Sequence, residues 1–258
     1  MIAAGPSTVT AGGAGRTLAG VLDLLAEAFL VPGADVRERA CQLAAEAVQA
    51  GEGLAAVGAA LKALDGTSPI DLDNEYVRLF LHGRPVTAHP YESFYRTGLL
   101  AAPECLVDLE ELFTAAGVRP GEAGPAALDH LGIELDLLAL LLHALVAPAL
   151  EPRVADVIAK VASRLLRDHL AGFAVAFTAR LAAANPGPYY RAAGALLASA
   201  IDAAGGLLSS GLEPLASSIS RFAETKTEPT CGGVVASHGD ALVLKRGAPP
   251  GTCAALGE

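Results

Sequence analysis

Apolar residues recur at helical spacing along most of the chain. The first stripe begins near Arg16 and follows the i, i+3, i+4, i+7 pattern of an amphipathic helix. It is formed by Leu18, Val21, Leu22, Leu25 and Phe29. Prolines and glycines separate the later stripes. These predict helices over residues 34–50, 54–64, 69–81, 104–116, 126–147, 151–184 with a break near 168, 189–204 and 213–223.

The two ends of the chain lack this pattern. Residues 1–15 are rich in Gly, Ala and Thr and are expected to be disordered. Residues 225–258 are rich in Gly, Pro and Thr, and they predict either a small β-hairpin around residues 234–244 or a disordered tail. Residues 16–224 are therefore expected to form a single-domain, all-α helical bundle, followed by a non-helical C-terminal tail.

Composition supports the all-α fold and argues against a membrane span. Hydrophobic residues make up 52% of the chain and aromatic residues only 5%, which favours helices because strands are enriched in aromatic and β-branched side chains. The longest uncharged run of the helical part, residues 137–150, is shorter than the about 18 apolar residues that a span needs. The N-terminus lacks the basic and apolar regions of a secretory signal. A cytoplasmic protein without stable membrane insertion is expected.

Charge and cysteine spacing exclude two further classes of function. With a net charge of −10 and no visible basic surface for phosphates, the chain is not expected to bind nucleic acid. An acidic surface suits a cationic partner, or it simply keeps an apolar protein in solution. The cysteines are scattered without a CxxC pair or zinc-finger spacing. Cys231, His238 and Cys253 of the tail are potential metal ligands without paired spacing.

Three clusters of polar and aromatic residues interrupt the apolar pattern. They are residues 75–80 (EYVRLF) with 91–95 (YESFY) across a proline-containing loop, residues 129–136 (DHLGIELD), and His169 with Phe173, Phe177, Tyr189 and Tyr190. Aromatic residues are scarce in this chain, so their concentration beside the loop at 82–90 favours a functional site there. The helical spacing of Leu79 and Phe80, and that of the third cluster, also fits side chains of the core.

The second cluster matches catalytic or metal-binding chemistry only in part. His130 and Glu134 are four residues apart and share one face of a helix. They lack the additional ligands that fix a metal, and Asp129 with His130 has no nucleophile to form a triad. An ion pair on the helix surface also explains His130 and Glu134. A helical metalloprotein or enzyme that uses Asp129, His130 and Glu134, or the tail cysteines, stays open as an alternative.

Five short motifs occur in an order that identifies a family resemblance. They are EYVRLF at 75–80, PYESFY at 90–95, DHLGIEL at 129–135, LLRDHLAGFAVAF at 165–177 and YY at 189–190. An all-helical chain with these motifs in this order resembles the TorD/DmsD/NarJ family of redox enzyme maturation chaperones. The resemblance covers about residues 16–222 and leaves out the tail.

The resemblance implies a function without covalent chemistry. Such chaperones bind the N-terminal peptide, often a twin-arginine (Tat) signal, of the catalytic subunit of a molybdoenzyme of the dimethyl sulfoxide reductase class. They hold this molybdopterin subunit in the cytoplasm until the cofactor is inserted. The chain is then expected to have no catalytic residues, no metal and no cofactor, and to be a monomer or a dimer. A helical scaffold subunit that stays in the mature complex is a third hypothesis.

The leader-binding site that this function requires is expected in the first two clusters. A leader needs an apolar groove for its helix and carboxylates for its arginines. The candidate residues are Tyr76, Phe80, Tyr91, Ser93, Tyr95, Asp129, His130, Glu134 and Asp136. In a helix that begins near residue 126, Asp129 and Asp136 lie on one face, and His130 and Glu134 lie on the adjacent one.

Overall fold

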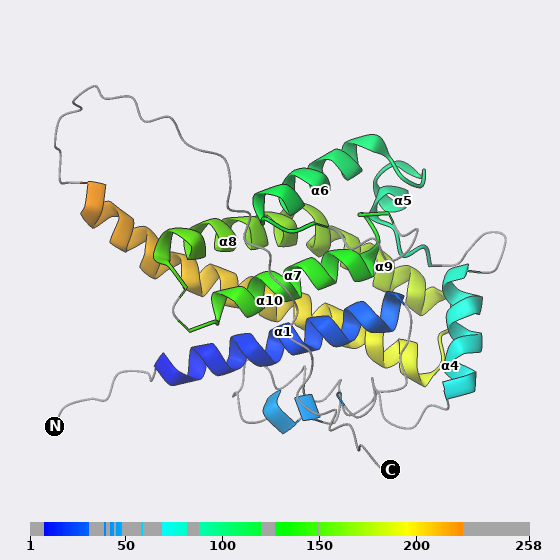
Figure 1. The fold of residues 1–258 in the computed structure, drawn as a ribbon. Helices are drawn as coiled ribbons and strands as arrows, with labels where there is room; N and C mark the ends of the chain where they lie inside the picture. Colours follow the sequence, from blue (N-terminus) through cyan, green and yellow to red (C-terminus); the bar gives the residue numbers. More distant parts are fainter. Residues whose placement is uncertain are drawn as a thin grey trace, which may run out of the picture.

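The protein is a bundle of helices in the computed structural model (Figure 1). The structure describes residues 8–30, 69–81, 88–119, 127–148 and 150–223, together with positions 39, 42, 43, 45–47 and 58. Within these residues the regular elements are all helical and no strand occurs, which confirms the predicted all-α fold. Most of the predicted helices at 34–50 and 54–64, most of the loop at 82–90, and the whole tail at 225–258 lie outside the described residues.

The helices form two layers around a shared core. The described elements are α1 (Thr8–Leu30), α4 (Pro69–Tyr76), η2 (Val77–Leu81), α5 (Glu92–Thr97), α6 (Pro103–Ala115), α7 (Leu131–Leu145), α8 (Pro152–Arg164), η3 (Leu165–Leu170), α9 (Ala171–Ala183) and α10 (Pro188–Ala223), where η marks π-helical turns. Helix α1 packs along α7, and α10 contacts both α1 and α9. Helices α5 and α6 lie at one side, over α8 and α9 (Figure 1).

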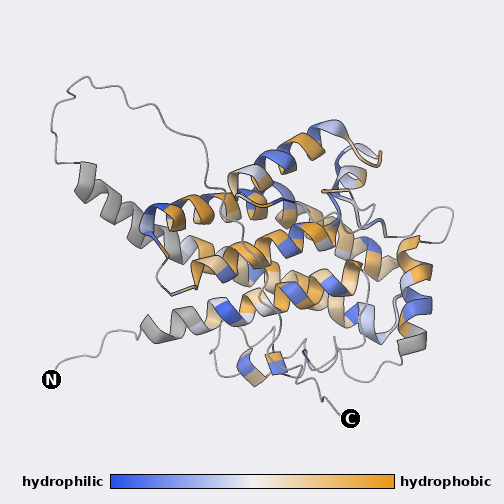
Figure 2. Ribbon diagram, in the orientation of Figure 1, coloured by the Kyte–Doolittle hydropathy of each residue, from blue (hydrophilic) through white to orange (hydrophobic). Residues whose placement is uncertain are grey.

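The predicted apolar stripe of α1 forms the centre of the core. All five of its residues are at most 1% exposed: Leu18, Val21, Leu22, Leu25 and Phe29. Figure 2 shows apolar residues concentrated along the central helices α1, α7 and α10. Because burial of each such side chain contributes about 1.5–3 kcal/mol, this stripe fixes the position of α1 in the bundle.

Two glycines let α1 and α7 approach each other closely. A Cβ atom on Gly132, in the first turn of α7, would lie 2.4 Å from Leu30 Cγ and 2.8 Å from the carbonyl oxygen of Ala26. Gly15 makes the same kind of approach at the other end, where a Cβ would lie 2.6 Å from Val146 Cγ1. The start of α7, and with it the segment around residue 130, is therefore held against the end of α1.

An aromatic cluster closes the end of the core beside α4. The ring of Phe29 lies 6.1 Å from Phe80, 5.2 Å from Phe177 and 6.2 Å from Tyr190. Tyr76 packs on Phe80 at 5.4 Å, and its hydroxyl donates a hydrogen bond to the carbonyl of the last residue of α1. Phe80 is 4% exposed. The packing role that helical spacing indicates for Phe80 and Phe177 is therefore confirmed.

Two helices are longer than their sequence pattern indicates. Helix α1 begins at Thr8 rather than near Arg16, so residues 8–15, which the sequence predicts to be disordered, lie in its first turns, and Gly15 there lies close to Val146. Helix α10 runs through Gly205 and Gly206. A helical glycine costs about 1 kcal/mol relative to alanine, but Ala204 and Leu208 continue the buried stripe and outweigh this cost. Near residue 168, where a break is predicted, the chain forms the wider π-helical turn η3.

Helix α10 contains a long apolar segment. Its segment Pro188–Ser209 is the one described segment that is long and apolar enough to cross a membrane. Half of that window is buried inside the protein, against α1, α8 and α9. The core helix of a helical bundle shows burial of this kind. A core helix and a membrane-spanning helix can have the same length and composition, so these two properties alone do not distinguish them.

Candidate functional site

The backbone joins two motifs that lie about forty residues apart in the sequence. Tyr91 and His130 form an isolated antiparallel bridge. On either side of it, the Glu92 N–H donates to the Asp129 carbonyl at 2.8 Å, and the Leu131 N–H donates to the Pro90 carbonyl at 2.7 Å. The YESFY and DHLGIELD motifs, which the sequence analysis assigned to one site, are thus in direct contact at the starts of α5 and α7.

Asp129 precedes α7 rather than lying in its first turns. Its Oδ2 accepts hydrogen bonds from the Ser93 backbone N–H at 3.2 Å and from the Ser93 hydroxyl, and both residues are fully buried. The predicted helix start near residue 126 is therefore wrong, and so is the predicted face shared by Asp129 and Asp136. The physical reason is that Asp129 accepts hydrogen bonds from the N–H groups of Glu92 and Ser93, the first residues of α5. This contact holds Asp129 in a turn that precedes α7.

His130 is the N-cap of α7. Its Nδ1 accepts a hydrogen bond from the Gly132 N–H at 3.1 Å, and its ring packs edge-to-face on Tyr91 at a centroid distance of 5.0 Å. Burial lowers the pKa of His130 to about 4. At neutral pH the ring is therefore uncharged, with Nδ1 as the acceptor and the proton on Nε2.

The neutral state of His130 predicts a pH-dependent stability. An unfolded histidine takes up its proton below about pH 6.5, whereas folded His130 does so only near pH 4. The unfolded state therefore binds more protons between these values, and this residue is expected to remove about 2–3 kcal/mol of stability as the pH falls from about 7 to about 4.5. Urea unfolding at both pH values measures the loss. His130→Asn keeps an N-cap acceptor and does not titrate, so an equal loss in this variant would contradict the assignment.

Glu134 is buried without a partner. It is fully buried in α7, and neither carboxylate oxygen has a hydrogen-bond partner among the described residues. Burial first, and then the charges of Glu92 and Asp129, raise its pKa well above the ordinary value. The surface ion pair between His130 and Glu134 that the spacing allowed is therefore not formed. Asp136, two residues further along α7, is half-buried.

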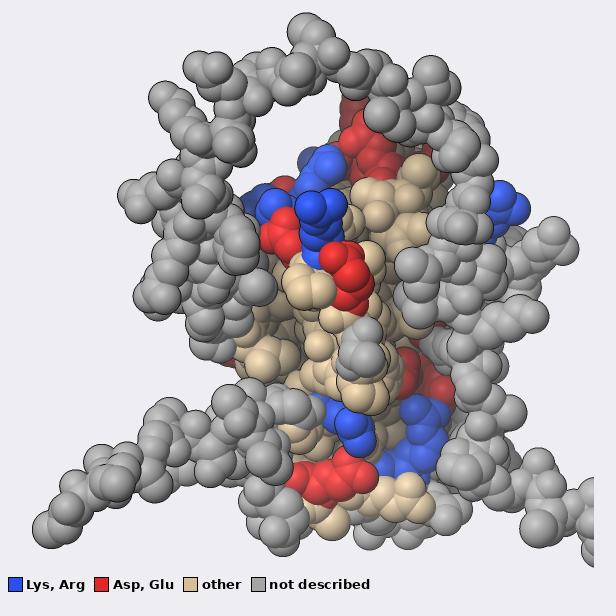
Figure 3. Space-filling model, turned by 60° about the vertical axis from the view of Figure 1, so that its left-hand side comes forward, with Lys and Arg blue, Asp and Glu red and all other residues tan. Residues whose placement is uncertain are grey.

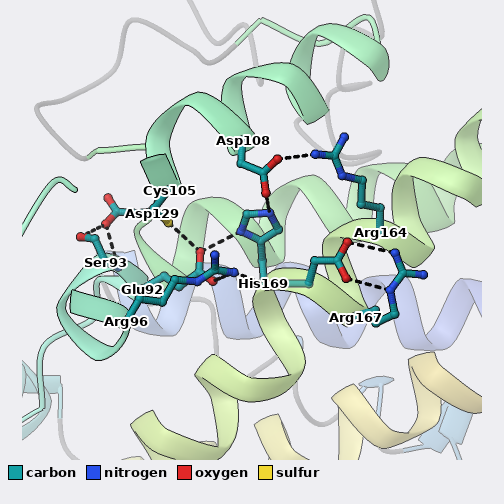
Figure 4. Close-up of polar contacts among 10 residues, drawn as sticks. Glu92, Ser93, Arg96, Cys105, Asp108, Asp129, Arg164, Arg167 and His169 are labelled. Atoms are coloured by element: carbon teal, nitrogen blue, oxygen red, sulfur yellow. Dashed lines mark hydrogen bonds and ion pairs between the residues drawn. The ribbon is translucent and has the colours of Figure 1, made fainter. Parts of the chain in front are cut away.

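A second buried group, which sequence reasoning missed, surrounds Glu92 (Figure 4). Glu92 Oε2 lies 2.8 Å from His169 Nδ1 and 3.0 Å from Cys105 Sγ, and its Oε1 lies 2.6 Å from Arg96. On the other side of the ring, His169 Nε2 lies 3.1 Å from Asp108 Oδ2. We call Glu92, Arg96, Cys105, Asp108 and His169 the buried network; it ties α5, α6 and η3 together.

The hydrogen bonds of the buried network keep Glu92 ionised. Burial by itself raises the pKa of Glu92, but the hydrogen bonds from His169 and Cys105, and the charges of His169 and Arg96, outweigh it and hold the pKa below its ordinary value. The Cys105 thiol shows the opposite behaviour, because burial and the hydrogen bond to Glu92 raise its pKa. Glu92 belongs to the YESFY motif, so this motif was the sequence signal that could have identified it as a site residue. The partners of Glu92 are too distant in the sequence to be deduced from it.

The accessible part of the site is aromatic rather than acidic. Tyr91, Phe94 and Tyr95 are half-buried, and we call them the aromatic face. The Arg180 guanidinium lies 4.9 Å from the Phe94 ring centroid and 5.7 Å from that of Tyr95. The ring of His89 lies 4.2 Å from Phe94. Of the predicted site residues, the structure therefore brings Tyr91 and Tyr95 to a partly open surface and buries Ser93, Asp129, His130 and Glu134 beneath it.

Tyr76 and Phe80 lie in the aromatic core instead. They connect to the aromatic face only through a chain of rings, in which Phe177 lies 6.1 Å from Phe80 and 6.2 Å from Phe173, and Phe173 lies 5.3 Å from Tyr95. Their predicted contact with a leader stays a prediction, and the burial of Phe80 does not favour it.

The surface is hollowed between α9 and α10. A depression of about 450 Å³ is lined by Thr178, Leu181, Asn185, Pro186, Arg191 and Ala195. Acidic side chains do not dominate the described surface in the view of Figure 3, where Lys and Arg alternate with Asp and Glu around uncharged residues. The net charge of −10 is therefore not gathered into one acidic patch on this face.

Comparison with known proteins agrees with the resemblance that the motifs indicate. The sequence profile of a family described as nitrate reductase delta subunit matches residues 42–179. This range is more than half of the 258 residues and contains both the Tyr91–His130 bridge and the buried network. The suspected family is thereby confirmed. A comparison with curated proteins finds no match.

Proposed function

Because the chain belongs to the nitrate reductase delta subunit family, a family of chaperones for molybdoenzyme maturation, we propose that it binds the N-terminal leader of a molybdopterin-containing catalytic subunit. The proposed client is of the dimethyl sulfoxide reductase class. The chaperone acts in the cytoplasm, as a monomer or a dimer, until the cofactor is inserted. Its activity is binding, and no residue of the chain has to react.

The Tyr91–His130 bridge is the observation that carries this proposal. It joins two of the motifs that carry the family resemblance into one unit, whose buried polar atoms face each other rather than a substrate. Such a unit holds the aromatic face rigid, and a pre-organised surface loses little conformational entropy when a peptide binds. The buried residues Ser93, Asp129 and His130 therefore act as positioning residues in this proposal.

The aromatic face is the proposed contact surface. Half-buried aromatic rings supply a large apolar area, which suits an amphipathic or apolar leader helix. Of the predicted carboxylates, Asp129 and Glu134 are fully buried and Asp136 is half-buried. Asp129 and Glu134 contribute in this account through the shape of the site and not through direct pairing.

Leader binding by Tyr95 is tested by calorimetry with synthetic peptides. The probe is a dibasic segment followed by an apolar helix, with a scrambled peptide of the same composition as its control. Tyr95→Ala is expected to weaken binding at least about tenfold, since a buried aromatic contact at an interface contributes more than about 1.4 kcal/mol. Val157→Ala, which removes an exposed apolar side chain on α8, is the matched control and should bind as the wild type does.

Two outcomes would count against this proposal. Absence of binding by the wild type to the dibasic peptide would remove the leader as the ligand. Equal affinities of wild type, Tyr95→Ala and Val157→Ala would leave the leader in place but reject the aromatic face as its site. Circular dichroism of each variant confirms that the affinities compare folded proteins.

A further inference from the structure

Three ligand atoms of different chemistry converge inside the buried network. Glu92 Oε2, Cys105 Sγ and His169 Nδ1 all lie within 4.8 Å of one another, and the three residues are at most 2% exposed. They come from α5, α6 and η3, so no single helix accounts for their convergence (Figure 4). The proposed leader site uses none of these atoms. A thiol, an imidazole and a carboxylate form the mixed donor set typical of zinc and related divalent transition metals, whereas magnesium and calcium prefer oxygen alone.

Glu134 provides an independent indication of a missing positive charge. It is completely buried, and both of its oxygens lack partners within the described part of the chain. The charges of Glu92 and Asp129 act on it, and its own charge acts on Cys105. An uncompensated buried carboxylate is costly, and Arg96 is already engaged by Glu92. A divalent cation among these side chains would supply the compensation.

The orientation of His169 also fits a metal ligand. While Nδ1 faces Glu92 and Cys105, Nε2 lies 3.1 Å from the Asp108 carboxylate, which is itself paired with Arg164. A carboxylate behind the second ring nitrogen is the usual support of a metal-bound histidine, because it fixes the ring and its tautomer. His169 also stands in a π-helical turn, a feature that occurs frequently at functional sites.

We propose that Glu92, Cys105 and His169 bind a divalent transition metal ion of the zinc class, with the buried charge of Glu134 nearby. The site would clamp α5, α6 and η3 together beneath the aromatic face, and a fourth position around the ion stays open to water. Neighbouring ligand atoms around zinc lie about 3.3 Å apart or more, so Glu92 Oε2 moves back by about half an ångström from His169. The Glu92 carboxylate and the Cys105 thiolate then balance the two positive charges of the ion.

Cobalt(II) binding to the full-length protein tests this site directly. Protein stripped with EDTA and dialysed is titrated with Co²⁺ under reducing conditions and followed by absorption spectroscopy. One equivalent should give the tetrahedral visible bands together with a thiolate-to-cobalt charge-transfer band, and Zn²⁺ should displace it. A variant with Cys41, Cys231 and Cys253 all replaced by serine keeps Cys105 as its one thiol and should give the same spectrum.

Variants of one ligand and of the neighbouring buried carboxylate assign the bands. Cys105→Ser should abolish the charge-transfer band, and Glu134→Gln, which keeps the side-chain volume, should weaken metal binding by about tenfold or more. If Cys105→Ser does not fold, the triple serine variant decides, since loss of its charge-transfer band overturns the proposal. A wild type without that band, or a band that persists in folded Cys105→Ser, overturns it as well. These spectra are independent of leader binding, so either proposal can fail alone.

Discussion

Replacing Phe80 with alanine is expected to lower the free energy of unfolding by about 3–5 kcal/mol. Phe80 is 4% exposed and contacts the rings of Phe29, Phe177 and Tyr190, so truncation leaves a cavity that these rings cannot fill. Chemical denaturation measures the loss. Val175→Ala, at a position 71% exposed on α9, is the matched control and should change stability by less than about 0.5 kcal/mol.

The Phe80→Ala variant also tests whether Phe80 belongs only to the core or also to the leader-binding surface. If Phe80 belongs to the core alone, the folded fraction of Phe80→Ala should bind a leader peptide with wild-type affinity. A stability loss below about 1 kcal/mol, which is typical of mutations outside a packed core, would contradict the packing role. A large loss of affinity in the folded fraction would instead return Phe80 to the leader-binding residues that the sequence predicts.

Breaking the buried network at Glu92 is expected to be equally costly. Glu92→Ala removes the carboxylate that accepts hydrogen bonds from His169 and Cys105 and pairs with Arg96, so the buried His169 and Cys105 side chains lose their acceptor. Removal of one partner from a buried ion pair costs about 3–5 kcal/mol. The measurement is urea unfolding in the presence of EDTA, so that no metal contributes. Glu110→Ala, an exposed carboxylate on α6, serves as the control and should have little effect.

A double-mutant cycle identifies the origin of that cost. Glu92→Gln, His169→Gln and the double variant should show a coupling energy above about 0.5 kcal/mol, because the two side chains are in direct contact. Additive losses in this cycle would mean that Glu92 and His169 stabilise the protein separately and that the pair at 2.8 Å does not matter.

The fold was largely predictable because helices leave a local signature. The stripe from Leu18 to Phe29 predicts the buried face of α1, since residues three and four apart lie on one side of a helix. Local signals failed where tertiary packing decides. Gly205 and Gly206 indicate a helix end, yet α10 continues past them because the residues on either side of them are buried in the core.

The candidate site was predictable as a set of motifs but not as a geometry. The sequence pattern predicts that Asp129 and His130 are helical. It does not show that Ser93, 36 residues earlier, binds Asp129 and keeps it outside the helix. Glu92 and His169 are 77 residues apart, and neither stands in a spacing typical of a paired site. Periodicity identifies which face of a helix is buried, whereas the pairing of buried polar groups depends on contacts between helices that no local pattern records.

Cofactor insertion into a client tests the central claim most directly. The molybdopterin-containing catalytic subunit from the same organism is produced with and without this chain, and the molybdenum content of the purified subunit is measured by mass spectrometry. A chaperone of molybdoenzyme maturation predicts that molybdenum per subunit falls severalfold without the chain and is restored by the wild-type protein. Equal molybdenum content with and without the chain would contradict the account.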